Sequence, residues 1–180
     1  MSALTFKIAE TPAELEQIFR LNYRTFVEEI PQREPNATGR LVDAFHAENT
    51  YLICMEGESL AGMLAVRGVR PFSLDRKLDS LDAYLPACPR PCEIRLLAIE
   101  AHYRKTTVFA GLFEHVVAFC RREGYDIALI SGVTRQQKLY RHLGFVPFGP
   151  LVGTPEAPFQ PMYLTESTLH ASQSMAAASK

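Results

Sequence analysis

The sequence has little of several features that would assign a protein to a particular class. Its 180 residues include no tryptophan and four cysteines, and 19 basic residues face 20 acidic ones, for a formal net charge of -1. A chain without a charge excess has no overall electrostatic attraction for nucleic acid or an anionic membrane. We therefore expect no nucleic-acid partner.

The cysteines contain one close pair, Cys88 and Cys92, in the segment Cys-Pro-Arg-Pro-Cys. A structural zinc site needs two more ligands near such a pair, whereas the five histidines are scattered along the chain. We therefore expect reduced thiols and no metal.

Long apolar runs are also missing. The longest ones fall far short of the roughly 20 residues that a membrane-spanning helix needs. The first residues mix Lys7, Glu10, Glu14 and Glu16 among the apolar ones, which is unlike a signal peptide. The expectations are no membrane span and a cytoplasmic location.

The residues that are present have the composition of an ordinary globular domain. Hydrophobic residues make up 47% of the chain and charged residues 22%. A chain of this length lies in the usual range for one domain with one core. We expect a single domain over residues 1–165, followed by a polar, alanine-rich tail, residues 166–180, that is disordered.

Hydrophobic periodicity predicts an alternation of strands and helices. The expected strands are residues 4–9, 50–55, 60–69, 93–99, 126–131, 145–148 and 160–165. The expected helices run from Pro12 to Ile30, across 109–120, and from 134 to 143, with a long loop over 70–91. Thr11 with Glu14, and Thr134 with Gln137, have the spacing of capping boxes. This order predicts an α/β domain with a mixed sheet.

One segment is informative beyond the order of strands and helices. Lys138-Leu139-Tyr140-Arg141-His142-Leu143 runs into Gly144-Phe145-Val146-Pro147, and this resembles the GNAT motif in which a leucine-tyrosine helix precedes Gly-Phe and a strand. The resemblance covers residues 92–149 well and the remainder in element order. It implies a mostly antiparallel mixed sheet, flanked by helices and splayed at its central parallel strands. It also implies acyl transfer from a thioester to an amine.

Two shorter segments resemble one branch of that superfamily. Glu93-Ile94-Arg95-Leu96 is similar to a strand of N-acyl amino acid synthases and acyl-homoserine-lactone synthases, and residues 23–29 (YRTFVEE) are similar to their N-terminal helix. Relatives in this branch commonly take acyl groups from acyl carrier protein. The resemblance makes Arg24, Phe26 and Arg95 candidates for binding the acceptor.

The resemblance also places the thioester donor. GNAT proteins cradle the coenzyme A pyrophosphate with an Arg/Gln-x-x-Gly-x-Gly/Ala turn at a helix N-terminus, where backbone N–H groups point outward together. The matching residues here are 104–109 (RKTTVF), in which Thr107 and Phe109 replace small residues. The implied contacts are Arg104, Lys105, Thr106 and Thr107 for the phosphates, and the backbone of Leu97, Ala98 and Ile99 for the pantetheine arm.

Glu93 and Tyr140 are the candidate catalytic residues. Side chains alternate between the two faces of a strand, so Glu93 would lie beside Arg95, on one face with Leu97 and Ile99. The resemblance implies that Glu93 accepts the proton of the attacking amine and that Tyr140 protonates the departing thiolate. The alternatives are a structural Glu93–Arg95 pair and a tyrosine packed at the core edge.

Three functions follow from these residues. The first is an N-acyltransferase that moves an acyl group from acyl-CoA or acetyl-CoA to an amine of a small molecule or amino acid, without a metal or a covalent enzyme intermediate. The second is a synthase whose donor is an acyl carrier protein thioester. The third is a degenerate GNAT-like module that binds a ligand without catalysis.

Overall fold

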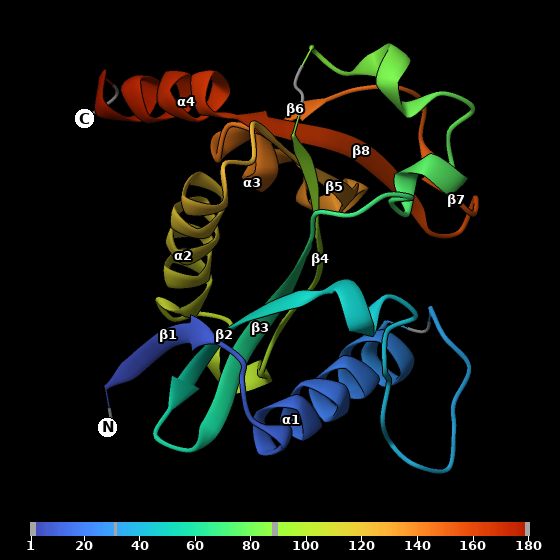
Figure 1. Cartoon of the computed structure of the whole chain (residues 1–180), viewed down its shortest axis with the longest axis vertical. Helices are drawn as coiled ribbons and strands as arrows, with labels where there is room; N and C mark the ends of the chain where they lie inside the picture. Colours follow the sequence, from blue (N-terminus) through green and yellow to red (C-terminus); the bar gives the residue numbers. More distant parts are fainter. Residues whose placement is uncertain (1–2, 31, 88–89, 179–180) are drawn as a thin grey trace. The chain divides into compact units, whose positions relative to one another are not determined.

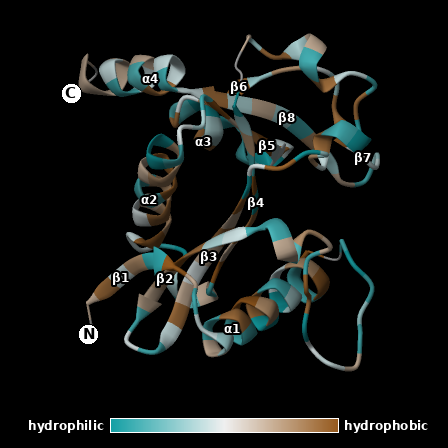
Figure 2. Cartoon of the chain, in the orientation of Figure 1, coloured by the Kyte–Doolittle hydropathy of each residue, from teal (hydrophilic) through white to brown (hydrophobic). Residues whose placement is uncertain are grey.

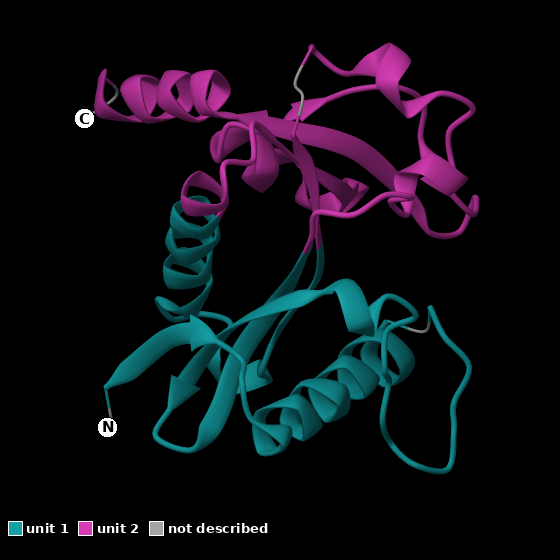
Figure 3. Ribbon diagram, viewed as in Figure 1, with its two compact units in different colours: residues 1–66, 95–119 teal, residues 67–94, 120–180 magenta. Residues whose placement is uncertain are grey.

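The computed structural model describes residues 3–30, 32–87 and 90–178 and divides into two compact units. Unit 1 comprises Met1–Val66 with Arg95–Phe119, and unit 2 comprises Arg67–Ile94 with Cys120–Lys180 (Figure 3). Strand β4 (Pro91–Ile99) and helix α2 (Val108–Glu123) each continue from one unit into the other. A single domain over residues 1–165 therefore stays a prediction.

Unit 1 is built on antiparallel strands (Figure 1). Its strand order is β1-β2-β3-β4, and the first three strands are Leu4–Ile8, Thr50–Glu56 and Ser59–Arg67. The β2–β3 pair closes at Glu56 opposite Ser59, with Gly57 at a φ of +61°. A left-handed residue is what a tight hairpin turn requires. The predicted hairpin is confirmed.

Helix α1 (Pro12–Tyr23) begins where the capping signal predicts. The Thr11 hydroxyl accepts a hydrogen bond from the Glu14 N–H, and the Glu14 carboxylate accepts from the Thr11 N–H. From Arg24 to Glu29 the chain continues as the π-helix η1. The predicted helix therefore extends almost to Ile30 but widens in its last part.

The apolar side of α1 packs on unit 1's sheet, and hydrophobic and hydrophilic residues alternate along the helix in Figure 2. We call the buried cluster the α1 core. Its members are Ile18, Phe19, Leu21, Tyr51, Ile53, Met55, Leu60, Met63, Ala65 and Ala98.

Unit 2 contains the one parallel strand pair recorded among the described residues. Its strand order is β4-β5-β8-β6, with β7 also paired to β8. These strands are β5 (Ile127–Val133), β6 (Val146–Pro147), β7 (Val152–Gly153) and β8 (Pro158–Thr165). The parallel pair runs from Pro91↔Ile127 to Glu93↔Leu129, and the pairs that β8 makes are antiparallel. The mixed, mostly antiparallel sheet is confirmed, while a splay at the parallel pair stays a prediction.

The segment between β3 and β4 is a long loop with two short turns, as predicted. The turns are η3 (Leu74–Arg76) and η4 (Leu81–Tyr84). The loop supplies half of a second buried cluster, which we call the loop core. Its members are Phe72, Leu74, Leu78, Leu81, Ile127, Leu129, Phe148 and Val152. The loop is therefore anchored to β5 by buried apolar side chains.

Two sequence expectations in unit 2, one about a helix cap and one about the C-terminal tail, differ from the structure. Thr134 lies inside the 3-10 turn η6 (Thr134–Gln136), which precedes helix α3 (Gln137–His142). No side chain caps the start of η6 or of α3, so the predicted capping box is wrong. The tail expected to be disordered instead forms helix α4 (Glu166–Ala178), with Leu169 buried. No helix in the described part of the chain is both long and apolar enough to span a membrane.

The Glu14 capping carboxylate predicts an acid-dependent contribution to stability. The hydrogen bond to Lys7 and those from the Glu10 and Thr11 N–H groups lower the pKa of Glu14 from 4.5 to about 2. A depressed native pKa stabilises the fold above the unfolded value, and this contribution is lost as the pH falls from 4.5 to about 2. We expect Glu14→Gln to lower the unfolding free energy by about 1 kcal/mol at pH 7.

Denaturant unfolding of the parent and Glu14→Gln at several pH values measures this difference. It should shrink across the window between pH 4.5 and about 2, whereas the exposed neighbour Glu10→Gln should change stability little at any pH. A deficit that is constant over the whole pH range would contradict the role of the charge.

Candidate active site

Glu93 lies on β4 in unit 2 and is almost fully buried, with 1% of its surface exposed. Its carboxylate accepts three hydrogen bonds from the start of the long loop. The Ser73 hydroxyl donates to Oε1 at 2.5 Å, the Ser73 N–H to Oε2 at 2.9 Å, and the Leu74 N–H to Oε1 at 3.3 Å. A buried carboxylate needs such donors because burial removes its hydration. The loop and the candidate base are therefore fixed to each other.

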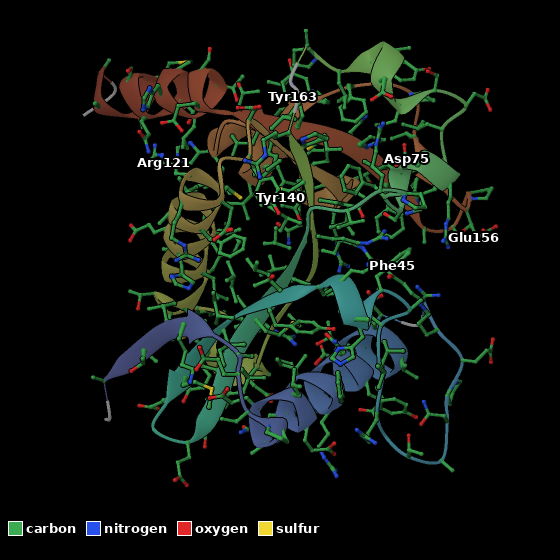
Figure 4. The ribbon with its side chains drawn as sticks, viewed as in Figure 1. Phe45, Asp75, Arg121, Tyr140, Glu156 and Tyr163 are labelled. Atoms are coloured by element: carbon green, nitrogen blue, oxygen red, sulfur yellow. The ribbon has the colours of Figure 1, made fainter. Side chains whose placement is uncertain are left out.

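Arg95, two residues along β4 and in unit 1, has a carboxylate partner that the sequence did not suggest. Its guanidinium donates to both oxygens of Asp43 at 2.7 and 3.2 Å and lies 4.7 Å from the centre of the Phe45 ring. Burial raises the pKa of Asp43, but the Arg95 charge and the Asn49 amide outweigh it, so the pKa lies below its ordinary value. Arg95 as a ligand for a substrate carboxylate stays a prediction. The Phe45 ring beside the Arg95 guanidinium is labelled in Figure 4.

The backbone of β4 is irregular immediately after Arg95. Leu96 has a φ of +56°, a left-handed value that is uncommon for a residue with a side chain. Leu96 packs on the α1 core together with Ala98, whereas Ile99 lies against Gly62 on the α2 side of the strand. Arg95 turns to Asp43, which binds Asn49 beside Tyr51 of the α1 core. The kink interrupts the regular alternation of side chains, and a face shared by Glu93, Arg95, Leu97 and Ile99 stays a prediction.

The expected donor loop lies in unit 1 between the turn η5 (Ala101–Tyr103) and α2. Thr106 closes it: its hydroxyl donates to the Tyr103 carbonyl at 2.7 Å and accepts from the Val108 N–H at 3.3 Å. The N–H groups of Phe109 and Ala110 have no recorded acceptor in the described part of the chain. Free N–H groups at a helix start favour an anion.

Arg104 is already engaged within this loop. Its Nε donates to the Ile99 carbonyl at 2.9 Å, and its guanidinium pairs with Glu29 of η1 at 2.6 Å. Arg24, at the other end of η1, pairs with Glu100. The two ion pairs tie η1 to the loop before α2. Each is partly exposed, so each contributes at most about 1 kcal/mol.

The remaining candidates of this loop and of η1 differ in exposure. Lys105 and Thr107 are exposed and Phe109 is half-buried. Phe26 packs against the α1 core, so at least part of its ring has a structural role. Binding roles for Phe26, Arg24 and the donor-loop residues stay predictions.

Tyr140 lies on α3 in unit 2, with its ring against β5 (Figure 4). A Cβ added at Gly132 would come within 2.9 Å of the Tyr140 ring, so the glycine makes room for it. The Phe145 ring packs edge-on at a centroid distance of 6.1 Å. Burial raises the pKa of Tyr140, so the phenol keeps its proton at neutral pH. Its hydroxyl makes no hydrogen bond with other described residues.

Metal ligands do not gather in the described ranges, where no group of three His, Cys, Asp or Glu side chains could hold an ion. Cys88 lies outside the described residues. Cys92 and Cys120 are free thiols in unit 2, with 3.8 Å between their sulfur atoms. The chemistry available from unit 2 is therefore that of a buried carboxylate bonded to a serine hydroxyl and of a protonated phenol.

Sequence reasoning missed Ser73 and Asp43. Ser73 lies 20 residues from Glu93, and Asp43 lies 52 residues from Arg95. Neither spacing belongs to a local motif, so one sequence carries no signal for either contact.

Comparisons with known proteins agree on the fold. The structure of a CoA-dependent acyl-homoserine lactone synthase, BjaI, with MTA matches at a TM-score of 0.80 and 21% identity, over 96% of this chain and 89% of that one. FeeM, an N-acyl amino acid synthase from uncultured soil microbes, matches at 0.72 and 19%, over 96% of both chains. A putative N-acetyltransferase from Lactobacillus plantarum matches at 0.66 and 16%, over 91% of this chain and 99% of that one.

Sequence comparison gives the family. A search of curated proteins found no match, whereas the model of the family described as N-acyl amino acid synthase FeeM matches residues 17–167. That match spans most of the 180 residues and includes β4, the donor loop and α3. The chain therefore belongs to the FeeM N-acyl amino acid synthase family and is an acyltransferase with a GNAT-like fold.

Proposed function

We propose that this enzyme transfers an acyl group from acyl-CoA to the amine of a small molecule or amino acid, in one direct step. The observation that carries the proposal is the Tyr140 phenol. It is held by Gly132 and Phe145, its pKa is raised, and its hydroxyl has no hydrogen-bond partner among the described residues. A protonated phenol with a free hydroxyl suits the proton that a departing thiolate must receive.

The proposed reaction uses two proton transfers. The amine nitrogen attacks the thioester carbonyl carbon and gives up a proton toward Glu93. The carbon–sulfur bond then breaks, and Tyr140 donates its proton to the sulfur. Arg95, Arg24 and Phe26 are the proposed acceptor-binding residues, and no covalent enzyme intermediate or metal takes part.

Coenzyme A is the proposed donor because cations and free N–H groups surround the start of α2. Arg104, Lys105, Thr106 and Thr107 would hold the phosphates with the Phe109 and Ala110 N–H groups, and the backbone of residues 97–99 would hold the pantetheine arm. The fold match to a CoA-dependent synthase supports this donor. Thr107 and Phe109 in place of small residues favour the second candidate, an acyl carrier protein thioester.

The donor proposal predicts that coenzyme A stabilises the protein against heat. A ligand that binds only the native state adds about 2.7 kcal/mol at 100 times its Kd. Pantetheine, which lacks the phosphates, should raise the Tm less. Arg104→Gln should weaken coenzyme A binding, while Glu29→Gln should strengthen it by up to roughly fivefold, because Glu29 competes with the phosphates for Arg104.

Calorimetric titration and melting curves measure these effects, with Arg20→Gln as the control for losing an exposed, paired arginine of unit 1. Equal shifts with coenzyme A and pantetheine, or none with either, would remove the phosphate site. Such a result would favour a carrier protein donor or a degenerate site.

The acid role of Tyr140 predicts that Tyr140→Phe lowers kcat by about 10²-fold to 10⁴-fold. The ring remains and the hydroxyl has no partner to lose among the described residues, so the Tm should stay the same. Tyr163 is a half-buried tyrosine of unit 2 whose ring lies 6.0 Å from that of Phe148, so Tyr163→Phe is the matched control and should keep full activity.

Thiol release from acetyl-CoA and octanoyl-CoA, with the amino acids as acceptors, measures turnover. Unchanged turnover in Tyr140→Phe would move the acid role elsewhere. A parent protein that releases no thiol with any acceptor would overturn acyl transfer from these coenzyme A thioesters. It would favour either a carrier protein donor or the non-catalytic binding module.

A further inference from the structure

The Glu93 carboxylate is too deeply buried to meet an amine by itself. With 1% of the residue exposed, its oxygens are surrounded by protein, and the groups that bind them include three donors from Ser73 and Leu74. Two of these donors are backbone N–H groups, which do not give up their protons. The third is the Ser73 hydroxyl, which can donate one proton and accept another.

Ser73 is bonded to the carboxylate and is less buried than its two neighbours in the loop. Its side chain is half-buried, whereas Phe72 and Leu74 on either side are fully buried in the loop core. The Ser73 Oγ lies 2.5 Å from Glu93 Oε1, the short distance of a charge-assisted O–H···O⁻ hydrogen bond. A proton leaving the hydroxyl therefore has its acceptor already in position.

The loop around Ser73 is held by several further contacts of unit 2. Arg67 donates to the Pro71 carbonyl, and the Phe72 N–H donates to Asp75 at 2.7 Å (Figure 4 labels Asp75). Arg70 binds both oxygens of Asp82 at 2.8 Å. The hydroxyl is thus fixed by its backbone rather than carried on a free loop.

We propose that the Ser73 hydroxyl relays the proton of the acceptor amine to Glu93. As the amine attacks, one amine N–H bond breaks and its proton bonds to Ser73 Oγ. In the same step the original Ser73 O–H bond breaks and its proton bonds to Glu93 Oε1. The serine is regenerated and the glutamate becomes neutral. The proton then returns from Glu93 to water by the reverse path, through the Ser73 hydroxyl. The relay rests on the proposed acyl transfer and assigns its base.

The test compares Ser73→Ala with Ser73→Thr, which restores a hydroxyl at the same position. Turnover is measured as thiol release from acetyl-CoA with the amino acids as acceptors. We expect kcat to fall about 10²-fold or more in Ser73→Ala, as for a lost proton-transfer group, and to recover largely in Ser73→Thr. Ser80→Ala, an exposed serine of the same loop with no side-chain cap bond, should match the parent.

A proton inventory in mixtures of H₂O and D₂O gives a readout that a structural role would not move. Two protons move together in the relay, so the parent's rate of the amine attack should fall along a curved line with deuterium fraction. A straight line for the parent overturns the relay even if the variants fail to fold. Equal loss in Ser73→Ala and Ser73→Thr overturns it as well, because the hydroxyl is then not the group that matters.

Glu93→Gln separates the failure of the relay from that of the proposed function. If Glu93→Gln loses turnover while Ser73→Ala keeps it, the relay is wrong and the acyl transfer stands. If both variants keep turnover, Glu93 is not the base and the relay falls with it, while thiol release itself still shows the acyl transfer. A parent that releases no thiol overturns both proposals.

Discussion

A buried carboxylate organises unit 2. Glu93 has lost its hydration, and the start of the long loop replaces that water with three hydrogen bonds. Removing these donors would take three hydrogen bonds from a buried carboxylate, so releasing the loop from β4 would lower the stability of unit 2. Phe72 and Leu74, next to Ser73 in the loop, are buried in the loop core. One electrostatic requirement thus fixes a loop that has little regular structure.

Unit 1 has a largely buried carboxylate of its own, Asp43. Arg95 and Asp43 bind each other through two hydrogen bonds, and Phe45 covers the guanidinium. The pair connects β4 to the segment that leads into β2. The left-handed Leu96 follows at once, and Arg24 and Arg104 hold η1 against the loop before α2. The three arginines proposed for the acceptor and the phosphates, Arg24, Arg95 and Arg104, are therefore partners in ion pairs before any substrate binds.

The parts that the sequence predicted are those with local signals. Thr11 and Glu14 lie three residues apart, and β2, β3 and β5 are short apolar runs, so these elements could be read from neighbouring residues. The GNAT-like fold was implied by the resemblance of residues 138–147. Thr134 had the same spacing without forming a cap, because the chain tightens into a 3-10 turn there. The polar tail folds as α4 because Thr165 and Thr168 cap its start and Leu169 is buried, contacts that composition does not reveal.

The sequence suggested candidate residues for the site but not the residues to which they are hydrogen-bonded. Glu93 and Tyr140 stood in recognisable segments, and the structure gives them burial and hydrogen-bonding states that suit proton transfer. Ser73 and Asp43 depend on contacts across 20 and 52 residues, which are set by the folded chain alone. The kink at Leu96 is equally hidden, because leucine carries no preference for a positive φ.

The discontinuity of the two units bears on how the chain folds during synthesis. Unit 1 ends at Phe119 and encloses the 67–94 segment of unit 2 within its own sequence. Its last strand and helix therefore emerge from the ribosome only after that segment, whose own partners β5 and β8 are synthesised later still. Unit 1 has all its residues by position 119, and unit 2 needs the last strand as well. The order of synthesis thus makes unit 1 complete before unit 2. A cut within residues 67–94 would break the chain of unit 2 and would also separate the two segments of unit 1.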